Sequence, residues 1–225
     1  MNKTEIIDWL KKYNITNYVI NDDLTVDVED DVYISSKKLT EIPFQFGKVK
    51  GDFLCNDNNL ISLKGCPSEI GGDFHCHYNK LTSLKGCPKK VKGNFICGDN
   101  KLTSLKGCPS EVSNEFDCSQ NKLTSLEGCP EIINGDFYCN YNELTSLEGS
   151  PKEVNGDFYC DNNQLISLKG CPEIINGDFY CYENKLISLK GCPEIINGEF
   201  FCDENLKDSI EYKRYLIKYK LQKIS

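Results

Sequence analysis

The sequence is short of several residue types. It has a single arginine, Arg214, one tryptophan, one methionine and two histidines, His75 and His77. Arginine supplies the planar fork that grips phosphates and guanine edges, so its near absence argues against direct nucleic-acid recognition. No stretch approaches the roughly 18 apolar residues that a membrane-spanning helix needs. We therefore expect a protein that binds neither nucleic acid directly nor a membrane.

Signatures of catalysis and of metal binding are missing as well. There is no Gly-x-x-x-x-Gly-Lys-Ser/Thr loop, no Gly-x-Ser-x-Gly turn and no Rossmann glycine pattern. His75 and His77 flank Cys76, and strand alternation places both imidazoles on one face and the thiol on the other, which disfavours a shared zinc ion. The sequence thus predicts a protein that is not an enzyme and holds no cofactor and no metal.

What the sequence does contain is a repeat of 21 residues. Seven full copies run over residues 51–197, a degenerate first coil precedes them at 30–50, and a partial copy follows at 198–205. A fixed period of this length predicts a solenoid, in which each copy buries its apolar side against its neighbours.

Each copy suggests a short strand and a strand-free remainder. Phe53 and Cys55 are two residues apart, so they share one face of a strand, and Asp52 and Leu54 take the other face. Pro67, in the Gly-Cys-Pro segment, rules out a helix there. We expect short parallel strands on one face of the solenoid and an extended, non-helical, proline-containing opposite side.

The Phe-x-Cys-x-x-Asn-x-Leu core of the repeat resembles the Leu-x-Leu-x-x-Asn-x-Leu core of leucine-rich repeats over residues 51–205. The resemblance implies that the asparagine side chains, from Asn58 at 21-residue intervals to Asn205, bond backbone groups of adjacent coils. The Gly-Cys-Pro segment is similar to repeats of bacteriophage and giant-virus proteins. That likeness implies a viral protein that inhibits a host factor in the host cytoplasm.

Both ends of the chain depart from the repeat. Residues 1–29 combine apolar residues at helical spacing with an alternating segment after an Asn-Asp-Asp turn, which predicts a helix plus hairpin as an N-terminal cap. Residues 206–225 carry six basic and two acidic residues, and Ile210, Ile217, Leu221 and Ile224 suggest an amphipathic C-terminal capping helix. Solenoid ends need such covers.

The fourteen cysteines form two columns rather than a disulfide framework. One column runs from Cys55 to Cys202 and the other from Cys66 to Cys192, with Ser150 in a gap of the second. Bridges within coils would leave Cys139 and Cys202 unpaired, and stacked side chains point in parallel. We expect buried free thiols, and hence a cytoplasmic protein.

Charge and aromatic residues gather in the later repeats. The net charge is −8, but residues 114–205 hold 17 acidic residues against 5 lysines. The candidate binding residues lie on the outward strand face of these coils: Tyr138, Tyr159, Tyr180, Phe201, Tyr182, Tyr141, Asp136, Asp157, Asp178, Asp161, Glu183 and Glu199. The tyrosines either stack for the sheet's own stability or form a binding surface. The carboxylates are met either by backbone amides or by a cationic partner.

These residues favour a non-catalytic protein-protein interaction module that binds a basic or amphipathic protein surface. Two alternatives stay open. In the first, the carboxylate columns imitate phosphates, and the protein is an acidic nucleic-acid mimic that blocks a DNA- or RNA-binding protein. In the second, it is a structural protein that assembles end to end through its caps. The oligomeric state is open as well.

Overall fold

The computed structural model describes residues 1–222, with side chains for residues 1–219. The chain divides into two compact units. The first unit comprises Met1–Leu102 and Lys106–Asn114, and the second comprises Thr103–Leu105 and the chain from Glu115 onward. Each unit is built from the same repeat.

The first unit opens with a helix and a hairpin and continues as coils. Its elements are α1 (Lys3–Lys12), β1 (Tyr18–Ile20), β2 (Val26–Val28), β3 (Val32–Tyr33), β4 (Phe46–Val49), β5 (Phe53–Leu54), β6 (Glu69–Ile70), β7 (Phe74–His75), β8 (Lys90–Val91), β9 (Phe95–Ile96) and β10 (Glu111–Val112). β1 and β2 are antiparallel. The later pairs are parallel, with a register shift between β2 and β4. From β3 and β4 onward the pairs are in register, so that Phe53 lies beside Phe74 and Ile70 beside Val91.

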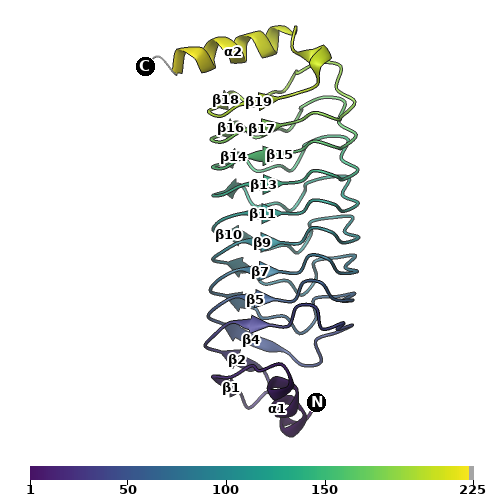
Figure 1. Cartoon of the computed structure of the whole chain (residues 1–225), viewed down its shortest axis with the longest axis vertical. Helices are drawn as coiled ribbons and strands as arrows, with labels where there is room; N and C mark the ends of the chain where they lie inside the picture. The colour runs from purple at the N-terminus through teal and green to yellow at the C-terminus, as the bar shows by residue number, and fades with distance from the viewer. Residues whose placement is uncertain (223–225) are drawn as a thin grey trace. The chain divides into compact units, whose positions relative to one another are not determined.

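The second unit repeats this arrangement and ends in a helix (Figure 1). Its elements are β11 (Phe116–Asp117), β12 (Ile132–Ile133), β13 (Phe137–Tyr138), β14 (Glu153–Val154), β15 (Phe158–Tyr159), β16 (Ile174–Ile175), β17 (Phe179–Tyr180), β18 (Ile195–Ile196), β19 (Phe200–Phe201), the 3₁₀ turn η1 (Glu204–Leu206) and α2 (Ile210–Gln222).

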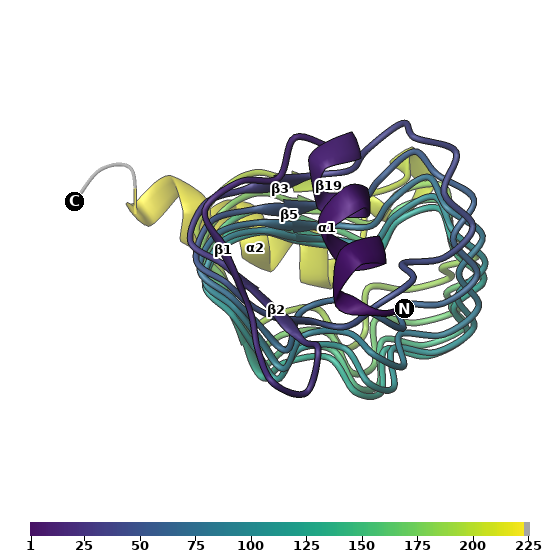
Figure 2. The same ribbon diagram turned by 90° about the horizontal axis from the view of Figure 1, so that it is seen from below.

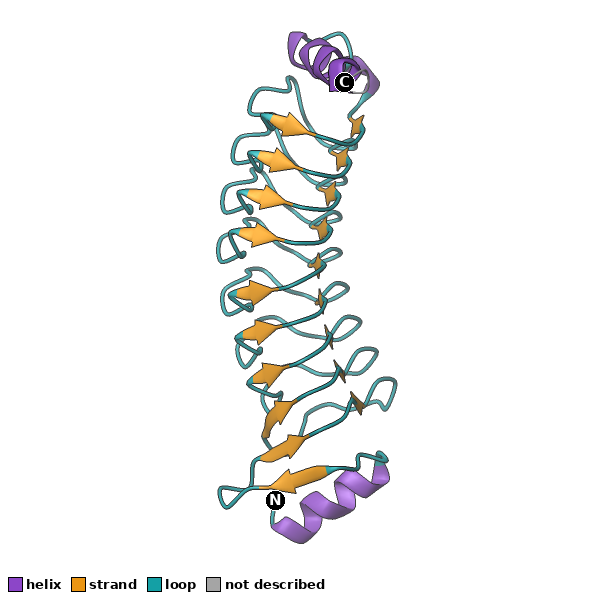
Figure 3. Cartoon of the chain, turned by 90° about the vertical axis from the view of Figure 1, so that its left-hand side faces the viewer, coloured by secondary structure: helices purple, strands orange, loops and turns teal. Residues whose placement is uncertain are grey.

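Each unit contains two strand ladders. The Phe ladder consists of β3, β5, β7 and β9 in the first unit and of β11, β13, β15, β17 and β19 in the second. The post-Pro ladder consists of β4, β6, β8 and β10, continued by β2 and β1, in the first unit, and of β12, β14, β16 and β18 in the second. Figure 3 shows both sets of arrows. The fold is a parallel β-solenoid with coils of 21 residues, and the solenoid prediction is confirmed.

The expectation that strands lie on only one face of the solenoid was wrong, because the post-Pro ladder is a second set of strands. After Pro151 the chain stays extended and bonds the coil before it, because Lys152 N donates to Glu131 O at 2.7 Å and Asn155 N donates to Ile133 O at 2.9 Å. Proline forbids a helix but permits a strand that begins one or two residues later. A two-residue strand is too short to show the alternation by which a sequence reveals it.

The core of each coil is a set of five apolar positions. In one coil of the second unit they are Phe137, Cys139, Leu144, Leu147 and Val154, none of which is exposed. Successive phenylalanine rings stack along the core, and the Phe137 and Phe158 centroids are 5.4 Å apart with 3° between the planes. All fourteen cysteines are free thiols, as expected, and nine of them are buried. The expectation of burial was wrong for five members of the second column, which are half-buried: Cys87, Cys108, Cys129, Cys171 and Cys192.

Buried asparagines tie the coils together along the inside of the turn after the Phe strand. The Asn142 side chain donates to Cys118 O and Cys139 O, both at 3.1 Å, and accepts from Leu123 N at 3.0 Å. The same pattern holds from Asn58 to Asn184 wherever both partners lie in one unit. Asn205 was expected to close the series, but it is exposed in η1, where the chain leaves the repeat.

Glycine is required at the corner before the post-Pro strand. Gly170 has φ +85°, and a Cβ there would lie 2.5 Å from Glu148 N of the preceding coil. Both the backbone conformation and the close approach exclude other residues.

At the start of the first unit, α1 lies across the end of the first coil (Figure 2). Asn2 and Glu5 form a capping box at its N-terminus. Ile6 and Leu10 are buried, and the Trp9 ring meets Phe44 edge-on at 5.1 Å and Phe46 at 6.2 Å. The helix thus covers core that the first coil would otherwise expose.

At the end of the second unit, α2 packs on the last coil through tyrosines. Tyr212 and Tyr215 lie 5.7 and 5.4 Å from the Phe200 ring, and the Tyr215 hydroxyl donates to Gly198 O at 2.9 Å. The expectation that Ile210 and Ile217 form the apolar face was wrong, because they are 67% and 61% exposed. The Leu221 side chain and residues 223–225, with Ile224, lie outside the described part.

Candidate protein-interaction face

The centre of the candidate face is a stack of four aromatic rings. Tyr138, Tyr159, Tyr180 and Phe201 occupy equivalent positions of β13, β15, β17 and β19, and the strand register places each beside the next. Successive centroids are 4.5, 4.4 and 4.6 Å apart, with 8°, 5° and 5° between the ring planes. The strand spacing of about 4.8 Å produces this face-to-face contact. We call these four residues the aromatic stack.

Each tyrosine of the stack is fixed by a carboxylate of its own coil. The hydroxyls of Tyr138, Tyr159 and Tyr180 each donate, at 3.1 Å, to the aspartate two residues earlier. Those acceptors are Asp136, Asp157 and Asp178. Alternation along the strand puts both side chains on the outward face.

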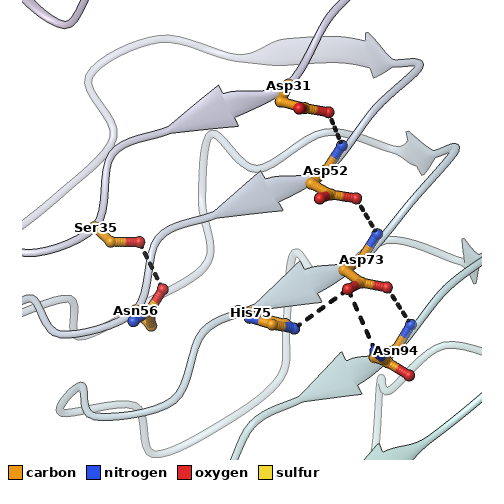
Figure 4. A network of polar contacts seen from close by, with 7 residues as sticks. All are labelled: Asp31, Ser35, Asp52, Asn56, Asp73, His75 and Asn94. Atoms are coloured by element: carbon orange, nitrogen blue, oxygen red, sulfur yellow. Dashed lines mark hydrogen bonds and ion pairs between the residues drawn. The ribbon is translucent and has the colours of Figure 1, made fainter.

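The second oxygen of each aspartate bonds the next coil. Asp157 N donates to Asp136 Oδ1 at 2.8 Å, and Asp178 N donates to Asp157 Oδ1 at 2.7 Å. The first unit has the same series, from Asp31 through Asp52 and Asp73 (Figure 4). Of the two explanations for the acid column, satisfaction by backbone amides is therefore the one that the structure supports.

Burial and these carboxylates together raise the phenol pKa values. The pKa of Tyr138, Tyr159 and Tyr180 is raised, first because burial disfavours the phenolate and then because a nearby aspartate repels it. In the first unit, the hydrogen bond to Asp31 raises the pKa of Tyr33 to about 12.

A raised phenol pKa makes alkaline conditions destabilising. The unfolded chain loses these protons near pH ~10, while the folded chain keeps them, so stability falls as the pH rises past that point. We expect absorbance at 295 nm to show phenols that ionise later than ordinary tyrosine while the protein is folded. Replacing Tyr138, Tyr159 and Tyr180 by phenylalanine should remove three of them and reduce the alkaline loss of stability. Ionisation of every phenol in one step near pH ~10 would contradict the geometry.

The remaining candidate residues differ in exposure. Tyr141 is 55% exposed in the turn after its strand, and Tyr182 is 37% exposed and meets Tyr180 edge-on at 6.5 Å. Glu183 and Glu199 are exposed. Through its edge-on contact, Tyr182 touches the half-buried aromatic stack directly.

Asp161 does not belong to the exposed set. It is only 3% exposed, its Oδ2 accepts from Asn162 at 2.8 Å, and burial raises its pKa. Its Oδ1 has no hydrogen-bond partner in the described part of the chain. The expectation that Asp161 presents a charge to a partner was wrong, because Tyr182 stands beside it one coil later and its position is covered.

Sequence reasoning missed the aromatic residues that α2 brings to the end of the stack. A hollow of about 230 Å³ lies between β19 and α2, and Tyr212, Tyr215 and Tyr219 line it together with Phe201. These tyrosines are three or four residues apart, which puts them on one helix face. That spacing could have revealed the packed face of α2, but the prediction used the spacing of the isoleucines.

Among the described residues, no group of three or more His, Cys, Asp or Glu side chains is placed to hold a metal ion. No helix within residues 1–222 combines the length and apolarity of a membrane span. No protein-family model, no curated protein and no solved structure matches this chain.

Proposed function

We propose that this chain is a non-catalytic protein-interaction module of the leucine-rich-repeat type, which binds a basic or amphipathic protein surface through the outward face of its second unit. The observation that carries the proposal is the aromatic stack, with its rings 4.4–4.6 Å apart and its hydroxyls held by aspartates. The asparagine bonds between coils support the repeat type, since they do what the resemblance implies.

A pre-formed aromatic face is well suited to binding. Tyrosine offers a large contact area and a hydroxyl, and rings already fixed by stacking lose little entropy when a partner arrives. The exposed Tyr141 and Tyr182 extend this face. The 17 acidic residues of 114–205, against 5 lysines, favour encounter with a basic partner.

The nucleic-acid mimic is the weaker alternative. A mimic needs carboxylates that are free to meet the cationic groups of the partner, but Asp136, Asp157 and Asp178 each already accept one hydroxyl and one backbone N–H. Salt separates the two functions, because binding by a mimic falls steeply with ionic strength and binding through aromatic anchors falls modestly.

The test is a double variant, Tyr159→Ala with Tyr180→Ala, compared with wild type. We expect binding to a partner captured by wild type to weaken by roughly tenfold or more, because two central anchors are lost. The control is Ile166→Ala with Ile187→Ala, which removes side chains that are 62% and 87% exposed in another column.

Affinities should be measured by calorimetry at low and high salt, after thermal melts show that both variants are folded. Equal affinities for wild type and the tyrosine variant would overturn the proposal. Binding that disappears at high salt in wild type and both variants would favour the mimic.

A further inference from the structure

The aromatic stack ends abruptly at Phe201, and the end is open. Tyr180 covers one face of the Phe201 ring at 4.6 Å, and no ring in the described part of the chain stacks on the other face. The hollow of about 230 Å³ between β19 and α2 lies there, with Phe201, Glu199, Lys207 and Tyr219 among its lining residues. Such a volume is below the usual ~300–1,000 Å³ of small-molecule sites and suits one side chain.

Glu199 differs from the other acids of its column. Asp136, Asp157 and Asp178 each accept a tyrosine hydroxyl, but the coil of Glu199 carries Phe201, which has no hydroxyl to give. Glu199 is exposed, and no side chain of residues 1–219 donates to its carboxylate. Because Glu199 and Phe201 are two residues apart on one strand, the carboxylate stands beside the open ring face.

The nearby cation does not neutralise this carboxylate. Lys207 lines the same hollow, but its Nζ bonds Glu204 Oε1 at 2.6 Å. The hollow therefore offers an open aromatic face and an unpaired negative charge. A planar cation matches both, since a guanidinium stacks on an aromatic ring and donates to a carboxylate at the ring's edge.

The strand edge also fits a peptide rather than a free cation. In the preceding coil, Phe179 N donates to Glu199 O and Cys181 N to Phe201 O, both across to the next coil at 2.8 and 2.9 Å. β19 is the last strand of its ladder, and the Tyr215 hydroxyl of α2 already meets the Phe200 N–H, so the corresponding N–H of Cys202 is the one with no coil beyond it. A carbonyl group of a bound segment can accept from this N–H.

We propose that this hollow binds an arginine side chain of a partner protein, with the guanidinium stacked on Phe201 and bonded to the Glu199 carboxylate. The inference rests on the proposed function in one respect, namely that the arginine belongs to the protein bound by the aromatic stack. The chemistry of the hollow is testable without that partner.

The probe is N-acetyl-arginine amide, titrated into the full chain with ¹³C-labelled phenylalanine and followed by NMR. We expect saturable shifts of the Phe201 ring signals, and weaker binding of N-acetyl-lysine amide, whose ammonium cannot stack as a plane. Glu199→Gln and Phe201→Leu should each weaken arginine binding by roughly threefold or more. For Phe201→Leu, the readout is the ring signals of Phe200.

Two control variants remove the same kinds of group elsewhere on the chain. Glu143→Gln removes an exposed charge of the second unit and Tyr78→Leu an exposed ring of the first unit; neither residue lines the hollow, and neither change should alter arginine binding. Equal binding of the arginine and lysine amides, tighter binding of N-acetyl-tyrosine amide, or no effect of Glu199→Gln would each overturn the inference. If the arginine amide fails to bind while Tyr159→Ala with Tyr180→Ala still abolishes partner binding, the inference fails and the proposed function stands.

Discussion

Replacing Phe158 by alanine is expected to lower the free energy of unfolding by about 3–5 kcal/mol. The ring is completely buried between Phe137 and Phe179, at centroid distances of 5.4 and 5.5 Å and nearly parallel to both. The cavity cannot collapse easily, because the flanking strands are held apart at a fixed spacing by their backbone ladder. The substitution therefore weakens the packing on both sides of one coil.

The neighbouring residue supplies the matched control. Tyr159 also stacks between two rings, at 4.5 and 4.4 Å, but on the outward face, where it is half-buried. We expect Tyr159→Ala to cost about 1 kcal/mol, as cross-strand aromatic pairs do. Urea denaturation followed by far-ultraviolet circular dichroism measures both variants. Equal losses would show that the inward and outward stacks contribute alike, against the burial pattern.

The parts of the fold that could be predicted from the sequence are those fixed by one residue type at a constant interval. Phenylalanine and cysteine two residues apart fix the inward face of the Phe strands, and Asn58 and its equivalents fix the bonds between coils. Both follow from strand alternation and from the donors and acceptors of an amide. No tertiary information was needed for them.

The post-Pro ladder could not be predicted in the same way. Glu153 and Val154 form a strand of two residues, which pairs with equivalent pairs in the coils on either side. The pairing arises because the Phe strands and the glycine corners already set the spacing of the coils. It is a consequence of stacking rather than a local preference of the two residues.

The outward position of the stacked tyrosines and their aspartates was predicted, and their hydrogen bonds were not. The sequence placed Tyr159 and Asp157 on one face, but it did not indicate whether the carboxylate would meet solvent, backbone or hydroxyl. In the structure the Asp157 carboxylate accepts from both the Tyr159 hydroxyl and a backbone N–H of the next coil. Asp161, in contrast, is buried. Such details depend on the offset between coils, which a single repeat does not contain.

The proposed function and the stability of this chain depend on different columns of the same repeat. The aspartates and tyrosines of the outward face satisfy one another, so the candidate binding surface is rigid before any partner arrives. The asparagines hold the coils at the spacing that makes this stacking possible. Removing one asparagine should therefore affect the solenoid more than removing an outward carboxylate or ring.

The second large effect is expected for Asn142→Ala, which should lower the free energy of unfolding by about 3 kcal/mol or more. The Asn142 side chain is 7% exposed and bonds Cys118 O, Cys139 O and Leu123 N. Alanine leaves the Leu123 N–H buried without an acceptor, which costs about 1–3 kcal/mol. It also removes one donor each from Cys118 O and Cys139 O, which keep the amides of Asn121 and Asn163, and each lost bond costs about 0.5–1.5 kcal/mol. The loss should appear in urea denaturation as a lower midpoint.

An asparagine in a different ladder is the control for this last prediction. Asn176 is exposed and bonds only other asparagine side chains, donating to Asn155 Oδ1 at 2.7 Å and accepting from Asn197 at 2.7 Å. Water replaces those bonds when the side chain is removed, so Asn176→Ala should cost about 0.5 kcal/mol or less. If the two alanine variants unfold at the same urea concentration, the buried amide bonds are not what fixes the spacing of the coils. The rigidity of the aromatic stack would then have to come from the Phe core alone, and Phe158→Ala should loosen the stacked tyrosines while Asn142→Ala leaves them unchanged.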